Sequence, residues 1–175
     1  MADDALGGGW RPLETHPVGA VIMRYASRSF VAGDPDGQAL RITYRQRPLG
    51  AEAAAHATAS APAELSARAW FGPRAEGPPG HAHGGSMAAV LDEAMGLAVW
   101  LAHRAAVAAH LETDFRRPIP LGTTVTVETT VGPAEGSGKA RVTGRLVGDD
   151  GTVFAEGSAL FVLLSARHGF AGGGA

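Results

Sequence analysis

Alternation of hydrophobic and polar positions marks two strands in the first half of the chain. Within Ala39–Arg45, the side chains of Leu40, Ile42 and Tyr44 fall on one side and the intervening polar side chains fall on the other. Ala63–Gly72 repeats the same period of two. This period is typical of a strand with one buried face, so both segments are predicted as half-buried strands.

The second half of the chain contains four more strand patterns at a steady spacing. They are predicted at His110–Phe115, Thr123–Val131, Lys139–Val147 and Thr152–Leu164. The segments GPAEGSG and GDDG separate the last three, and both are rich in the residues that form hairpin turns. A further turn is predicted at Asp34–Gly37. These connections favour an antiparallel meander.

One long helix is predicted between the two groups of strands, from Ser86 to His103. Its apolar residues cover most of its circumference, which indicates a helix buried on nearly every side. A helix of about 18 residues is about 27 Å long. A curved antiparallel sheet of five to six strands wrapped around this helix buries it most simply, which is an α+β architecture. Ala51–Ser60 is predicted as a short helix or a loop.

Length and composition add only broad limits. The 175 residues suit a single domain, 1–175, in which 1–16 and 168–175 are predicted as flexible tails. The formal net charge of −2 provides no general attraction to nucleic acid or to an anionic membrane. The acidic beginning lacks the pattern of a signal peptide, and no apolar run approaches the roughly 18 residues of a membrane span. We therefore expect a cytoplasmic protein with no nucleic acid or membrane partner.

Candidate chemistry concentrates in GPPGHAHGGSMAAVLDEAMG, from Gly77 to Gly96. Gly84–Ala88 nearly matches the G-x-S-x-G of serine hydrolases, but that motif follows a strand of a parallel sheet, and here a Pro/Gly loop precedes it. His81 and His83 have the spacing of two metal ligands on a strand, but no third ligand stands at a matching distance. The chain also has no cysteine. Neither a serine nucleophile nor a metal site is favoured, and no cofactor is expected.

A third interpretation uses the start of the helix itself. The pair Gly84–Gly85 lets a substrate approach the unpaired N–H groups of the first helical turn, where the helix dipole is positive. Such N–H groups stabilise an oxyanion that develops on a carbonyl. Asp92 and Glu93 follow on the same helix, and a carboxylate there supplies a base or a nucleophile. The alternative is that both acids lie on a solvated stripe, which the apolar surroundings disfavour.

The segment HGGSMAAVLDEAMG, His83–Gly96, resembles the active-site segment of hotdog-fold acyl-CoA thioesterases of the phenylacetate-pathway and thioesterase-superfamily type. Three other segments resemble the first hairpin, the strand after the helix and the closing hairpin of that family: Phe30–Tyr44, Leu111–Gly122 and Gly151–Leu164. The resemblance implies the hotdog fold. It also implies hydrolysis of a coenzyme A thioester without a metal.

The same resemblance assigns roles to individual residues. Asp92 matches the catalytic acid on the helix, and Glu93 is the second choice because about 100° of helix rotation separates the two. Gly85 matches the N–H donor to the oxyanion, with Gly84 assisting. His83 matches the histidine that contacts or orients the thioester. Direct attack by the acid and activation of water both remain open.

Substrate binding and assembly are implied as well. Ser86, Arg116 and Arg117 are expected to bind substrate, the two arginines through coenzyme A phosphates. A solvated basic strand end is an equally good interpretation of the arginines. Hotdog subunits pair so that the glycine donor and the acid of one site come from different chains. A homodimer or a tetramer built from two dimers is therefore implied.

Some positions depart from the family pattern. Ser29 and Ala32 stand where many relatives carry cysteines. Ala108 stands where many relatives carry the threonine or serine that holds the attacking water, and Thr113 is five residues further on. Two rival functions stay open. One is an acyl-thioester dehydratase or hydratase, whose histidine spacing this chain lacks, and the other is a non-catalytic acyl-CoA-binding hotdog protein, which Ala108 favours.

Overall fold

The structure is a computed structural model that describes residues 11–13, 29–34, 36–47, 64–103, 105–136 and 138–164. Within these residues, seven strands form one antiparallel sheet in the order β1-β2-β3-β5-β6-β7-β4. The strands are β1 (Arg11–Pro12), β2 (Leu40–Arg47), β3 (Glu64–Phe71), β4 (Ala106–Phe115), β5 (Thr124–Glu135), β6 (Lys139–Val147) and β7 (Val153–Leu163). The helical elements are the short 3-10 helix η2 (Pro73–Ala75) and the long helix α3 (Gly84–Ala102).

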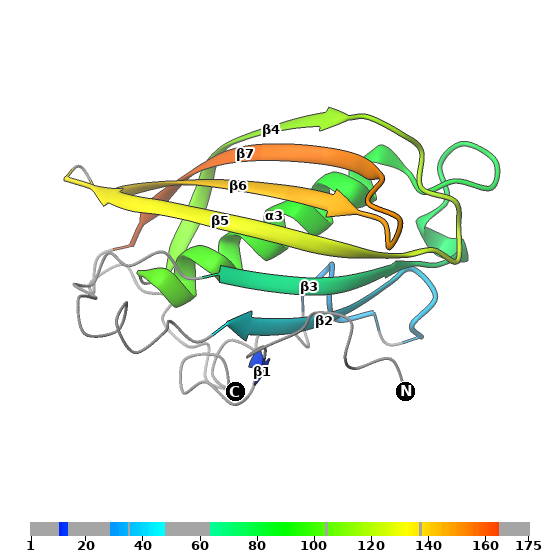
Figure 1. Cartoon of the computed structure of the whole chain (residues 1–175), viewed down its shortest axis with the longest axis horizontal. Coiled ribbons are helices and arrows are strands. Elements are labelled where there is room, and N and C mark those ends of the chain that lie inside the picture. The colour runs from blue at the N-terminus through cyan, green and yellow to red at the C-terminus, as the bar shows by residue number, and fades with distance from the viewer. Residues whose placement is uncertain are drawn as a thin grey trace.

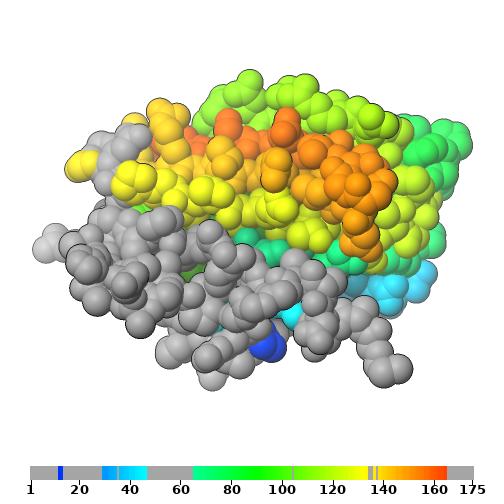
Figure 2. Space-filling view, viewed as in Figure 1, coloured from blue at the N-terminus to red at the C-terminus, as the bar shows by residue number. Residues whose placement is uncertain are grey.

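Helix α3 lies against one face of the curved sheet (Figure 1). In the same view, the space-filling picture shows side chains of the sheet in front of most of the helix (Figure 2). Gly144 on β6 and Gly157 on β7 are paired directly across the two strands. A Cβ at Gly144 would lie 3.1 Å from Leu91 and 3.2 Å from Met95. The two glycines therefore allow the helix to approach the middle of the sheet closely.

The buried side chains of α3 fill the space between helix and sheet. They are Met87, Val90, Leu91, Ala94, Met95, Leu97, Ala98 and Val99. By length and mean hydropathy, α3 is the one helix among the described residues that could cross a membrane. A core helix passes the same test, and the sheet that packs on α3 accounts for its apolar sequence.

The predicted fold is confirmed, because an antiparallel sheet wraps one long helix. The six longer strands correspond to the six predicted ones. Strand β4 begins at Ala106, four residues earlier than predicted. Its first residues are small and do not alternate, so no pattern marked them as a strand, but their backbone pairs with β7. Arg11–Pro12 lie in the predicted N-terminal tail and pair with β2. The predicted element at Ala51–Ser60 lies outside the described residues.

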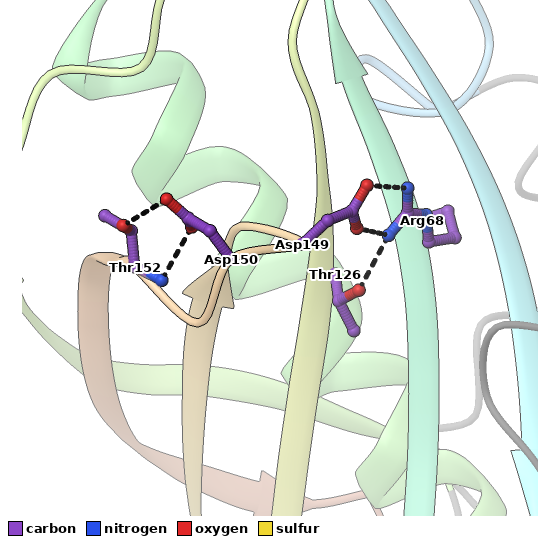
Figure 3. Close-up of polar contacts among 5 residues, drawn as sticks. All are labelled: Arg68, Thr126, Asp149, Asp150 and Thr152. Carbon is purple, nitrogen blue, oxygen red and sulfur yellow. Dashed lines mark hydrogen bonds and ion pairs between the residues drawn. The ribbon is translucent and has the colours of Figure 1, made fainter.

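Two adjacent aspartates hold the turn between β6 and β7 (Figure 3). Asp150 accepts hydrogen bonds from the backbone N–H and the hydroxyl of Thr152, both at 2.9 Å. Asp149 forms an ion pair with Arg68 on β3, and Arg68 also donates to the Thr126 hydroxyl on β5 at 3.0 Å. These donors lower the pKa of both carboxyl groups. The turn is thereby tied to two other strands of the sheet.

Strand β4 forms one edge of the sheet, and among the described strands it pairs only with β7. Most of its side chains are exposed. Two of them are large and apolar: Val107 is 40% exposed and Phe115 is 54% exposed. A ten-residue edge strand with apolar side chains in solvent is a template for pairing with another chain.

Candidate active site

Backbone hydrogen bonds to two separate parts of the fold fix the start of α3. Ala82 N–H donates to Ile119 O at 2.9 Å. His83 N–H donates to Ala75 O, in η2, at 2.7 Å. The Pro/Gly loop before the helix is therefore held from both sides, so the first helical turn has a defined position.

His83 caps the N-terminus of α3. Its Nδ1 accepts a hydrogen bond from Gly85 N–H at 2.8 Å, so the ring carries its proton on Nε2 when it is neutral. Its carbonyl oxygen accepts from Ser86 N–H at 2.9 Å and from the Ser86 hydroxyl at 2.7 Å. Gly84 N–H donates to no acceptor within the described residues. The structure thus adds a detail to the predicted donor pair: Gly84 N–H is open, whereas His83 occupies Gly85 N–H.

A side chain at either glycine would crowd a neighbouring ring. A Cβ at Gly85 would lie 2.9 Å from Nδ1 of His83, closer than real Cβ atoms approach. A Cβ at Gly84 would lie 3.3 Å from the ring of Phe115, at the end of β4. The aromatic ring therefore lies next to the open N–H group. The sequence analysis did not identify Phe115, because only the folded chain brings the end of β4 to the start of α3.

Asp92 and Glu93 line a cavity of about 310 Å³ beside the second half of α3. The lining residues come from α3, β4, β7 and the segment before β2, and they are Ser29, Asp92, Glu93, Gly96, Leu97, Trp100, Ala106, Val107, Ala108 and Phe161. Both acids are half-buried. One end of the cavity is therefore acidic, and its other walls are largely apolar.

Partial burial changes the acidity of both carboxyl groups. It raises the pKa of Asp92 above the ordinary value. It also raises the pKa of Glu93, against the effect of a hydrogen bond from Ser29, and the charge of Asp92 raises it further. A carboxyl group whose pKa moves towards neutrality is well suited to exchange protons with a substrate.

Two of the lining residues bear on the predicted departures from the family pattern. Ala108 lies in the same cavity as Asp92, so a methyl group stands where a hydroxyl is usual in the resembling family. Ser29 also lies there, and its hydroxyl lowers the pKa of Glu93. No pattern in the sequence connects Ser29 with the acids, since more than sixty positions separate it from Glu93.

The helix N-terminus and the acids are well separated within one chain. Gly85 and Asp92 are seven residues apart on α3, which is about 10.5 Å along the helix axis. Seven residues make nearly two full turns, so both lie towards one side of the helix. A single carbonyl group cannot contact both at once.

The predicted arginines lie directly after the end of β4. Arg116 forms ion pairs with Asp114 at 3.2 Å and with Glu156 at 3.1 Å, on the exposed surface. Arg117 is exposed, and its charge helps to lower the pKa of Asp150. The ring of Phe115 lies beside Gly84, at the N-terminal end of α3. Arg116 and Arg117 follow Phe115 directly in the chain, so they lie closer to the helix start than to the cavity.

The histidines considered as metal ligands have other contacts. His83 Nδ1 caps the helix, and His81 Nδ1 lies 2.9 Å from Pro79 O. Within the described part of the chain, no three His, Cys, Asp or Glu side chains gather closely enough to hold a metal ion.

Comparison with known proteins shows which family this arrangement is similar to. Residues 79–153 match the family model of the thioesterase superfamily. This segment holds the whole of α3 and the capped glycine pair, and the architecture around it is the hotdog fold. The family resemblance and the fold inferred from the sequence are both confirmed.

Individual relatives refine this placement. The chain is 34% identical over 93 residues to an acyl-coenzyme A thioesterase THEM4 of Xenopus laevis, covering 53% of this chain and 42% of the relative. The chain thus spans about two fifths of the length of the curated relatives it matches.

Solved structures give the same fold. The protein BH2602 of Bacillus halodurans, solved with CoA, has a TM-score of 0.51 and 28% identity, covering 57% of this chain and 66% of that one. Zebra fish thioesterase superfamily member 2 has a TM-score of 0.57 at 17% identity, covering 80% and 91% of the two chains. The second likeness concerns the fold alone.

Proposed function

We propose that the protein is an acyl-CoA thioesterase that hydrolyses a coenzyme A thioester to a free acid and CoA. The observation that carries the proposal is a half-buried Asp92 with a raised pKa at the acidic end of an otherwise largely apolar cavity. Apolar walls suit an acyl group, and a carboxylate at the cavity end suits attack on its carbonyl. The relatives named acyl-CoA thioesterases and the CoA in the BH2602 structure support the same substrate class.

In this proposal, N–H groups at the start of α3 polarise the thioester carbonyl. Gly84 N–H is open, and Gly85 N–H becomes available when the carbonyl oxygen replaces His83 Nδ1 as its acceptor. Asp92 then attacks the carbonyl carbon or removes a proton from an attacking water. The N–H groups stabilise the oxyanion that forms, and no metal or other cofactor takes part.

The proposed site requires two copies of the chain. A donor about 10.5 Å from the acid along one helix cannot serve the same carbonyl, so the acid must come from a second copy. The exposed edge of β4 offers the surface for this pairing, and β4 carries Val107 and Ala108 from the cavity lining. We propose a homodimer with two equivalent shared sites, or a tetramer of two such dimers.

Coenzyme A is proposed to lie near the start of α3. Arg117 is exposed there and is available to bind a phosphate group. Arg116 would exchange its surface ion pairs with Asp114 and Glu156 for a phosphate, which costs little because exposed pairs of this kind are weak.

The test is release of free thiol from a panel of acyl-CoA substrates, followed with a disulfide reagent. Wild-type protein is expected to release CoA from at least one member, and Asp92→Asn is expected to lower the rate by about 10²- to 10⁴-fold. Asp36→Asn is the matched control, since Asp36 is exposed and its carboxylate pairs with Arg74 at the surface. Equal rates for the wild type and Asp92→Asn would remove Asp92 from the reaction.

A second function, acyl-CoA binding without hydrolysis, is favoured by one observation. Ala108 leaves the cavity without the hydroxyl group that is usual at that position. Calorimetric binding of a non-hydrolysable acyl-CoA analogue by the wild type, together with absence of thiol release from every substrate in the panel, would support this second function and rule out the first.

A further inference from the structure

Four residues in the second half of α3 stay partly open to solvent. Among residues 91–100, Asp92, Glu93, Gly96 and Trp100 are half-buried, and the others are buried. Asp92, Gly96 and Trp100 follow one another at intervals of four, so each lies about one helical turn beyond the last. All three line the cavity. They therefore form one row along it, with the acid at one end and the indole ring at the other.

Trp100 lies at the far end of this row, and its ring is held in place. Its indole N–H donates to Ala106 O, at the start of β4, at 3.0 Å. The bond joins the last part of α3 to the first residue of β4, and Ala106 also lines the cavity. The end of the cavity opposite the acids is therefore formed by an anchored aromatic ring.

Gly96, in the middle of the row, leaves a space that a methyl group would fit. A Cβ at Gly96 would lie 3.5 Å and 3.7 Å from two atoms of the Phe161 ring, which is ordinary van der Waals contact. A glycine inside a helix is less favourable than an alanine, because it loses more conformational freedom on folding. Packing and helix stability thus both permit a side chain here. The glycine instead leaves a notch in the wall of the cavity, beside Phe161.

We propose that the row of Asp92, Gly96 and Trp100 limits the length of the acyl group, so that the preferred substrates are unbranched acyl-CoA thioesters of up to about eight carbons. Asp92 acts at the thioester carbonyl, the notch at Gly96 accommodates the middle of the chain, and the Trp100 ring stops its end. Gly96 and Trp100 are then specificity-determining residues. The inference deepens the proposed thioesterase function and rests on it.

The spacing along the helix sets the expected length. Gly96 lies about 6 Å and Trp100 about 12 Å beyond Asp92 along the axis, since a helix rises about 1.5 Å per residue. An extended chain advances by about 1.2 Å per covalent bond, so an acyl chain reaches the notch after about five bonds and Trp100 after about ten. The indole ring occupies part of that length, which leaves room for about eight carbons.

The lining also favours a chain without polar groups. Beyond Ser29 and the two acids, the described residues of the lining have no charged or hydroxyl side chain. The indole N–H of Trp100 is already donated to Ala106 O. A carboxyl or hydroxyl group at the end of the acyl chain would lose its water there and find no partner in this lining. Hexanoyl-CoA is therefore expected to be a better substrate than adipoyl-CoA, which has the same number of carbons.

The experiment measures kcat/KM for acetyl-, butanoyl-, hexanoyl-, octanoyl-, dodecanoyl- and hexadecanoyl-CoA. The wild type is expected to prefer octanoyl-CoA over dodecanoyl-CoA by about tenfold or more. Trp100→Leu removes the ring and is expected to raise the ratio of dodecanoyl-CoA to octanoyl-CoA turnover by about tenfold. Trp70→Leu is the matched control, because the Trp70 ring lies against Arg41 outside the cavity, and it is expected to keep the wild-type ratio.

Gly96→Ala separates this role from a structural one. The methyl group fills the notch, so the ratio of octanoyl-CoA to acetyl-CoA turnover is expected to fall by about tenfold. The melting temperature is expected to rise, since alanine is the better helix former. Gly136→Ala, in the turn between β5 and β6 with open space around it, is the matched control and is expected to keep the wild-type ratio.

The outcomes distinguish this inference from the proposed function. If the wild type is active but Trp100→Leu, its milder counterpart Trp100→Phe and Gly96→Ala all keep the wild-type chain-length profile, the role of the row falls and the thioesterase proposal stands. If the wild type hydrolyses no acyl-CoA, the thioesterase proposal falls, and calorimetric binding of thioether analogues of the same series decides the inference. A length limit that moves in the Trp100 variants supports it, and an unchanged limit overturns it.

Discussion

At the scale of the residue, the proposed site depends on groups whose surroundings are unfavourable for stability. Asp92 and Glu93 are carboxyl groups placed half out of water against apolar walls. Burial raises their pKa values, which means that the folded protein favours their neutral forms. Such residues are retained in a core helix when they are used, because an apolar side chain would pack there at lower cost.

Asp92→Asn is expected to make the protein more stable at neutral pH while it lowers the proposed activity. Because the pKa of Asp92 is raised in the folded state, its contribution to stability is present below its unfolded pKa and is lost as the pH rises through the folded pKa. At pH 7 the ionised group therefore opposes folding, and the asparagine does not. The melting temperature of the variant should exceed that of the wild type at pH 7, and the difference should vanish below about pH 4.

The same raised pKa predicts the acid limb of the reaction. If Asp92 must be ionised to act, kcat/KM falls as the pH drops through a value above that of an ordinary aspartate. An acid limb at or below the ordinary aspartate value would contradict this expectation. A melting temperature of Asp92→Asn below that of the wild type at pH 7 would contradict the stability argument.

At the scale of the element, the start of α3 and the end of β4 are built against each other. A methyl group at Gly84 would lie 3.3 Å from the ring of Phe115, which is a tight contact. The ring of Phe115, from a different element, therefore lies beside the residue that carries the open N–H group. We therefore expect the position of the proposed oxyanion donor, Gly84 N–H, to depend on the contact with Phe115.

Gly84→Ala is expected to lower kcat/KM by about tenfold, because the added methyl group displaces either the ring or the helix start, and small displacements of catalytic groups are costly. The double variant Gly84→Ala, Phe115→Leu removes the ring that the methyl meets and should recover part of the rate. Steady-state kinetics of the two variants and of Phe115→Leu alone measure the coupling between the sites. Independent, additive effects would show that the contact does not matter.

The edge strand β4 is expected to mediate pairing between copies. Val107→Lys places a charge on this edge, and charged side chains on an edge strand prevent pairing with another chain. Sedimentation analysis should show dimers for the wild type and monomers for the variant. Thr143→Lys, exposed on the interior strand β6, is the control and should remain a dimer. A Val107→Lys variant that stays dimeric would move the interface elsewhere.

At the scale of the whole molecule, the separation along α3 implies that activity belongs to the assembly. Each proposed site takes its N–H donors from one chain and its acid from the other. A dimer in which one chain lacks the acid and the other lacks the donor then keeps one intact site out of two. Symmetric homodimers with shared sites have this property, whereas sites contained within one chain do not.

Mixing two inactive variants is therefore expected to restore activity. Asp92→Asn lacks the acid, and Gly85→Pro lacks the N–H group. Proline is accepted in the first helical turn, and here it also requires the His83 ring, which caps this N–H, to turn away. When equal amounts are mixed and allowed to exchange subunits, about half of the dimers are mixed and each has one active site, so about a quarter of the wild-type rate should return. No recovery after proven exchange would mean that each chain holds a complete site.

Much of the fold could be predicted from the sequence. The period of two in Leu40–Tyr44 reflects burial of one face of a strand. The apolar circumference of Ser86–His103 reflects burial of a helix on nearly all sides. Both patterns depend only on local spacing. The candidate N–H donors and acids of His83–Gly96 could be identified for the same reason, since they lie on one continuous helix. The family match over 79–153 agrees with that interpretation.

What the sequence by itself determined is the element order, the helix that must be buried and the presence of glycines and acids on it. Only the tertiary structure decided what surrounds them. It brought Ser29 to Glu93, Phe115 to Gly84 and Ala108 to Asp92, and it turned the His83 ring onto Gly85 N–H. The reason is physical: local periodicity reports which face of an element is buried, whereas contacts between distant segments depend on how the sheet curves around the helix, and no spacing along the chain records that curvature.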